Sequence, residues 1–318
     1  MAITGSAAVK AAGDRPWSEA AAATLVELTA LVRERAEQLH DHADVEDVHD
    51  ARTATRRLRT AITVYGDDKG DQKAIEKELR RVGRKLGSVR DLDVLLETLE
   101  AASTSGNGGI DATDLDPLRN AWQRERAEGA RDLKQMIDHE RFNRALDHVA
   151  DLAPDDDAPW DDGSPTGERH RISDMAPALI WDAFGKVLAF ELDPLTADPT
   201  AIHLARIAAK KLRYTLEVFE AALEPGATLI REVTALQDAA GEMHDAIVAR
   251  DRARSTIEQD DAGKRERVAA EAFADAQDRR AERQRPVTAR RLTTVRSRAF
   301  RDSLGAAVAG IGHVSPGS

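Results

Sequence analysis

Residues 48–65 read VHDARTATRRLRTAITVY, and this stretch predicts a helix with two distinct faces. At about 100° per residue, the apolar face consists of Ala51, Thr55, Leu58, Ile62 and Tyr65. Beside it, within an arc of about 80°, lie His49, Arg52, Arg56 and Arg59. Because these cations stand three or four positions apart, they repel one another and cost stability unless an anion offsets their charge.

The same pattern occurs a second time. Residues 202–219 read IHLARIAAKKLRYTLEVF, and 203 − 49, 206 − 52 and 213 − 59 all equal 154. Seven of the 18 aligned positions are identical: His, Ala, Arg, Ala, Leu, Arg and Val. The second basic face consists of His203, Arg206, Lys210 and Arg213, with Tyr214 at its edge. Packing requires the apolar positions of a repeat but not its cations, so their presence in both copies indicates an anion-binding site.

Length and composition indicate an all-α protein built from two copies of one unit. The chain has 318 residues, only 4% of them aromatic, and no run alternates as a strand would. We expect a leader at 1–15, a first helical repeat at 16–153, an acidic Pro/Gly-rich linker at 154–167 and a second repeat at 168–312. Each copy offers about four helices, which predicts a bundle.

The distribution of charge bears on the partner and the compartment. The net charge is −11, while the cations gather on a few helices. Such a layout focuses positive potential in one place and suits a slim anion better than duplex nucleic acid. The chain has no cysteine, no apolar signal sequence and no run of roughly 20 apolar residues. We therefore expect a cytoplasmic protein without a membrane span.

The long helix expected at 73–99 adds further cations. They are Arg80, Arg81, Arg84 and Arg90. The second copy places Thr234, Ala235 and Asp238 opposite the first three of these, which predicts an asymmetric site. Gly87 and Asp91 recur as Gly241 and Asp245 at the same offset of 154; we expect the aspartates to orient neighbouring cations or to pair within the bundle.

The histidines allow a second interpretation. His244-Asp245, downstream of His203, is similar to the His…His-Asp pattern of metal-dependent phosphohydrolases. However, Arg90 occupies the position that matches His244, and arginine does not ligate a metal. We instead expect His49 and His203 to donate to an anion and to gain charge as the pH falls towards about 6.5. Two alternatives to simple anion binding remain, a metal-dependent phosphohydrolase or polyphosphate-processing enzyme and an RNA-associated scaffold.

VHDARTATRRLR with GRKLGSVRDLDVL, repeated as IHLARIAAKKLRYTLEVF with LQDAAGEMHDAIV, resembles the CHAD family, the conserved histidine α-helical domain. The resemblance implies two four-helix bundles related by pseudo-twofold symmetry, with a basic central groove that binds inorganic polyphosphate. It places the binding positions on His49, Arg52, Arg56, Arg57, Arg59 and Arg90, and on His203, Arg206, Lys210, Lys211 and Arg213. To these we add Arg80, Arg81, Arg84, Tyr214 and His244 as candidates.

The chemistry of polyphosphate fits these side chains. Guanidinium and ammonium groups bind phosphate oxygens through charge-assisted hydrogen bonds, and the sequence has no aromatic ladder on which bases would stack. We therefore expect non-catalytic polyphosphate binding without a metal or cofactor, including at polyphosphate granules.

Overall fold

The computed structural model describes residues 13–41, 43–66, 71–104, 112–154, 170–190, 199–259 and 263–311. Apart from a bridge between Pro16 and Arg171, the regular structure in these ranges is helical, which confirms the all-α prediction. The helices are α1 (Trp17–Asp41), α2 (Val45–Tyr65), α3 (Gln72–Thr104), η1 (Ala112–Leu115), α4 (Asp116–Asp138), α5 (Glu140–Asp147), η2 (Ala150–Leu152), α6 (Ile172–Leu188), α7 (Pro199–Val218), η3 (Glu220–Ala222), α8 (Gly226–Gln259), α9 (Lys264–Arg296) and α10 (Arg298–Ala309). None of these helices has the length and apolar character needed to cross a bilayer.

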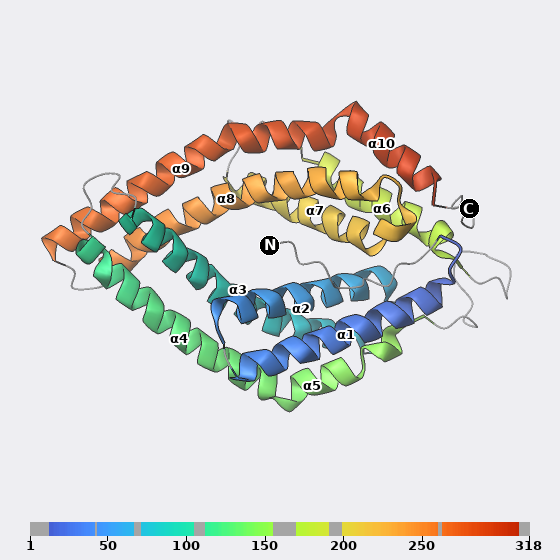
Figure 1. The fold of residues 1–318 in the computed structure, drawn as a ribbon, viewed down its shortest axis with the longest axis horizontal. Coiled ribbons are helices and arrows are strands. Elements are labelled where there is room, and N and C mark those ends of the chain that lie inside the picture. The colour runs from blue at the N-terminus through green and yellow to red at the C-terminus, as the bar shows by residue number, and fades with distance from the viewer. Residues whose placement is uncertain are drawn as a thin grey trace.

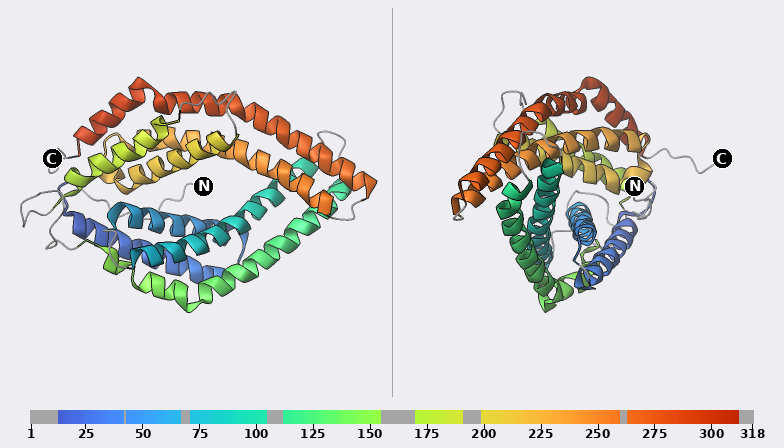
Figure 2. Two further views of the ribbon diagram at one scale, coloured as in Figure 1. Left: turned by 180° about the vertical axis from the view of Figure 1, so that it is seen from behind. Right: turned by 60° about the vertical axis from the view of Figure 1, so that its left-hand side comes forward.

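The helices form two halves that face each other (Figure 1). Helices α1 to α5 make the first half and α6 to α10 the second; α2 and α7 lie on the inner sides, whereas α4, α5, α9 and α10 lie outside (Figures 1 and 2). The long helices α3, α4, α8 and α9 extend to one end of the molecule, where the halves meet. The basic helices of the two sequence copies are therefore neighbours.

Each half differs from the expected bundle of about four helices, because its described part contains five α-helices. In the second half, α9 runs without interruption through Pro286. A proline removes one backbone donor, and the extended packing of α9 along α8 maintains the helix there. The break falls instead at Ser297, whose hydroxyl caps α10 by accepting from the Phe300 amide at 3.1 Å.

The start of α2 follows from its sequence. The Asp44 carboxylate accepts hydrogen bonds from the amides of Glu46 and Asp47, both at 2.9 Å, and so satisfies two of the free donors of the first turn. All five residues of the predicted apolar face are buried. The neighbouring basic face therefore points away from the core of the first half.

The main core contains residues of both halves. Trp17 packs on Tyr65, with ring centroids 4.6 Å apart, and Phe219 of the second half lies 6.4 Å from Tyr65. Tyr65 and Phe219 occupy matched positions, since 219 − 65 = 154. Contact between matched positions is what a twofold relation would give; the duplication itself stays an inference from the sequence.

A second core joins the halves at the far end. Trp122 of α4 packs against Phe273 of α9 with ring centroids 6.2 Å apart. Its indole N–H donates to the Thr256 hydroxyl of α8 at 3.1 Å. This buried aromatic pair holds together the ends of the long helices of the two halves.

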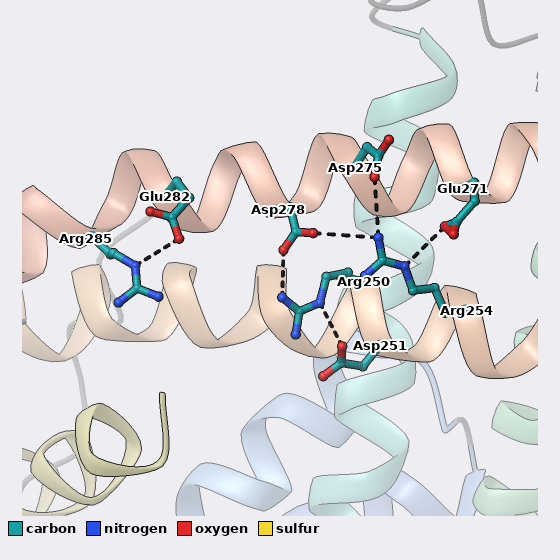
Figure 3. A network of polar contacts seen from close by, with 8 residues as sticks. All are labelled: Arg250, Asp251, Arg254, Glu271, Asp275, Asp278, Glu282 and Arg285. Atoms are coloured by element: carbon teal, nitrogen blue, oxygen red, sulfur yellow. Dashed lines mark hydrogen bonds and ion pairs between the residues drawn. The ribbon is translucent and has the colours of Figure 1, made fainter. Parts of the chain in front are cut away.

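Between α8 and α9, cations and carboxylates are matched (Figure 3). Arg250 lies 2.6 Å from Asp278 and 2.7 Å from Asp251, and Arg254 lies 3.1 Å from Glu271. The network also includes Asp275, Glu282 and Arg285. Exposed pairs of this kind contribute little stability each, but every arginine of this network has a carboxylate partner. The inner helices differ in this respect.

Of the expected domain boundaries, most of the leader and nearly all of the linker at 154–167 lie outside the described residues.

Candidate anion-binding site

In the first half, the basic face of α2 lies against α3. Arg52 extends across Gly87 and donates from Nη1 to the Gly87 carbonyl at 3.5 Å and to the Asp91 carboxylate at 3.1 Å. A Cβ atom at Gly87 would stand 3.9 Å from the guanidinium carbon, so the glycine leaves room for the arginine to lie on α3. Asp91 thus orients a neighbouring cation, as expected.

The second half repeats this arrangement between α7 and α8. Arg206 lies over Gly241, and its Nη2 atom is 3.6 Å from the Cβ position of that glycine. His203 packs on His244, with ring centroids 4.6 Å apart. In the first half, the matched pair is His49 and Arg90. The positive charge of Arg90 contributes to lowering the pKa of the His49 imidazole.

Tyr214 joins the two basic faces. The guanidinium carbon of Arg56, from α2, lies 4.6 Å from the centroid of the Tyr214 ring, and that of Arg213, from α7, lies 4.7 Å from it. These are cation–π distances, and Tyr214 is only 6% exposed. Two arginines from different halves are therefore held at one buried ring.

Lys210 lies among these arginines. Burial, together with the charges of Arg206, Arg56, Arg52 and Arg213, lowers the pKa of its ammonium group to about 7. These five cations, Arg52, Arg56, Arg206, Lys210 and Arg213, are called the central cluster below. The sequence predicted all five, and the structure brings them together between α2 and α7.

The central cluster is incompletely compensated. Arg52 pairs with Asp91, and Arg213 lies 3.5 Å from Glu217. No ion pair of Arg56, Arg206 or Lys210 occurs within the described ranges. The Nε atoms of Arg56, Arg206 and Arg213, Nδ1 of His203 and the Tyr214 hydroxyl are buried without a hydrogen-bond partner. Buried polar atoms are normally paired, so this cluster is well suited to take an anion.

The histidines titrate differently from the sequence expectation. Burial and the charges of Arg206 and Lys210 lower the pKa of His203. Partial desolvation and Arg90 lower the pKa of His49, and burial with Arg206 and His203 lowers that of His244 to about 4. Gain of charge near pH 6.5 is therefore the wrong expectation, because the surrounding cations disfavour imidazolium.

Three further predicted cations gather beside the cluster. Burial lowers the pKa of Arg59, and the charges of Arg80 and Arg84 lower it further, against the opposing charge of Glu76. The guanidinium of Arg59 lies 3.6 Å from the Cβ position of Gly83. The sequence analysis did not single out Gly83, which is not repeated in the second copy, where Gln237 occupies the matched position.

Four predicted residues lie apart from the cluster or are neutralised. Arg81 donates to both oxygens of Glu78 at 3.0 and 3.1 Å, and Arg90 pairs with Glu97 at 2.9 Å. Lys211 is exposed. Arg57 lines a separate cavity of about 200 Å³ between the halves, together with Thr24, Glu27, Leu28, Thr60, Tyr214, Glu217, Val218, Glu220 and Ile230.

Carboxylates also approach the cluster from α8. Burial raises the pKa of Asp245, as does the charge of Asp91, whereas Arg206 and Arg280 of α9 lower it. Sequence reasoning missed Arg280, since it lies far from the repeated motif. Among the described residues, no group of three or more His, Cys, Asp or Glu side chains could hold a metal ion.

Known proteins resemble this chain in both sequence and fold. No curated protein matches. The crystal structure of the CHAD domain from the plant Ricinus communis covers 96% of this chain and 95% of its own, with a TM-score of 0.61 and 21% identity. PptA from Streptomyces chartreusis covers 87% of this chain and 99% of its own, with a TM-score of 0.64 and 19% identity. The CHAD domain family matches residues 22–254, and the chain belongs to this family.

Proposed function

We propose that the chain binds inorganic polyphosphate, without catalysis, through the central cluster. The observation that carries the proposal is the pair of buried Nε atoms of Arg56 and Arg206, which have no hydrogen-bond partner in the described part of the chain. Guanidinium forks match the oxygens of a phosphate and bind them by charge-assisted hydrogen bonds. A linear polyanion would satisfy donors from both halves at once.

The surroundings favour polyphosphate over a nucleic acid. Tyr214 is buried and both of its cation–π partners are arginines of the cluster, so its ring offers no platform for a base. The net charge of −11 disfavours a bulky polyanion. We place this binding in the cytoplasm, including at polyphosphate granules.

Calorimetry with polyphosphate at two salt concentrations tests the proposal. If the five cations of the cluster each neutralise one phosphate, log K should fall against log salt with a slope of about −3.5, from about 0.7 per contact for a single strand. The double variant Arg56→Glu/Lys210→Glu should abolish binding. Arg144→Glu/Arg298→Glu is the matched control, because in the described part of the chain these exposed cations pair with acids on α5 and α10 alone and the nominal charge change is equal.

Loss of folding is separated from loss of binding by circular dichroism and by Lys210→Met, which removes one charge without reversing it. Binding that survives Arg56→Glu/Lys210→Glu in a folded protein would refute the proposal. Release of phosphate with magnesium or manganese would favour the enzyme alternative. Equal competition by RNA at matched phosphate concentration would favour the scaffold alternative.

A further inference from the structure

On the side of the first half, cations continue beyond the central cluster towards α3. Arg59 follows Arg56 by one turn of α2 and lies against Gly83 of α3. The positive charges of Arg80 and Arg84, both on α3, lower the pKa of Arg59. We call Arg59, Arg80 and Arg84 the α3 arm.

In the second half, an acidic residue and a neutral residue occupy the positions matched to the two arginines of α3. Since 84 + 154 = 238 and 80 + 154 = 234, the matched residues of α8 are Asp238 and Thr234. Asp238 is exposed; partial desolvation raises the pKa of its carboxyl, the charges of Arg213 and Arg206 lower it, and the charge of Glu242 raises it. A polyanion that left the cluster along α8 would therefore meet the carboxylate of Asp238 directly after Arg213.

The α3 arm is free to rearrange towards a ligand. Arg84 is exposed and has no ion pair within the described ranges. Arg80 has a side chain that is 51% exposed and lies 3.4 Å from Glu76. Exposed pairs at this distance contribute little, so a phosphate can replace the carboxylate at small cost.

We propose that polyphosphate leaves the central cluster in one direction, along the α3 arm, and that this arm makes the protein prefer long chains to short ones. The inference rests on the proposed function. A short polyphosphate can satisfy the central cluster and end there. A long chain must place its remaining charges on a surface that is acidic overall, and the α3 arm is the basic continuation beside Arg56.

Two probes test this, inorganic triphosphate and a long-chain polyphosphate, each titrated into the whole protein at one salt concentration. The variant Arg80→Glu/Arg84→Glu should weaken long-chain binding at least about tenfold, because two charge-assisted contacts are lost. It should also reduce the long-chain salt slope by about 1.4, at about 0.7 per phosphate. Triphosphate binding should stay within about twofold of the wild type, because a short polyphosphate satisfies the central cluster and ends there.

The controls are Arg144→Glu/Arg298→Glu, with an equal change in net charge, and Asp238→Arg, which alters only the second half. If the wild type binds neither probe, the proposed function and the inference both fail. If it binds both, but Arg80→Glu/Arg84→Glu weakens them equally or not at all, only the inference fails. A long-chain preference that responds to Asp238→Arg and not to Arg80→Glu/Arg84→Glu would show that the chain leaves along α8 and would also overturn it.

Discussion

Lys210 should make polyphosphate binding take up a proton. In the free protein, burial and four neighbouring guanidinium groups lower its pKa to about 7. A phosphate beside the ammonium group reverses this balance, because an opposite charge favours the charged form. Binding therefore raises the pKa of Lys210 towards the ordinary value of about 10.4.

The size of the effect follows from the two pKa values. At pH 7.5, about three-quarters of the free protein carries a neutral Lys210, so binding should take up about 0.8 proton. The pKa is higher in the complex, so the contribution of Lys210 is complete below about pH 7 and is lost as the pH rises towards about 10. Between pH 7 and pH 9 the affinity should fall about 50-fold.

Calorimetry in two buffers of different ionisation enthalpy measures the proton uptake directly. Lys210→Met should abolish the uptake above pH 7, and any titration of the polyphosphate ends remains in this variant as the baseline. The pKa values of His49, His203 and His244 are lowered in the free protein, and any proton that these side chains take up on binding also remains in Lys210→Met. An equal uptake in the wild type and in Lys210→Met, or none in either, would refute the reasoning.

Three further changes have defined outcomes. Tyr214→Phe should keep the polyphosphate affinity, whereas Tyr214→Leu should lower it about tenfold in calorimetry, because two cation–π contacts of about 0.5–1 kcal/mol each are lost; equal effects would contradict this role. Asp91→Ala should release Arg52 from its 3.1 Å contact and weaken binding several-fold; phosphate turnover that disappears in this variant would instead indicate catalysis. Trp122→Ala should cost about 3–5 kcal/mol in denaturant unfolding and leave polyphosphate affinity unchanged in the folded protein; a loss of affinity would show that the far core positions the cluster.

Local chemistry explains which parts of the fold could be predicted. The start of α2 was predictable because the Asp44 side chain caps it and the apolar face has helical period. The division between α9 and α10 was not, because Pro286 is a local signal for a break, whereas α9 packs along α8 and continues to Arg296. Local propensity gives way here to a contact that the sequence pattern does not reveal.

In the candidate site, too, some residues could be placed from the sequence and others depend on tertiary packing. Arg52 and Arg206 could be placed from the repeat, because each lies over a glycine that also recurs, Gly87 or Gly241. Arg57 could not, since one residue beyond Arg56 it lines the separate cavity. Sequence spacing gives the face of a helix, but which neighbour that face meets depends on the partner half.

Arg59 and Arg213 show how matched residues come to differ. Arg59 lies along α3 because Gly83 leaves space beside it, whereas the matched position in the second half holds the larger Gln237. Arg213 turns instead to the ring of Tyr214, 4.7 Å away, where the first half has only Thr60. Two substitutions off the basic face thus send one arginine outward along α3 and the other inward to the cluster. They direct two matched arginines differently, and Arg59 is the one that continues along α3, in the direction of the proposed polyphosphate path.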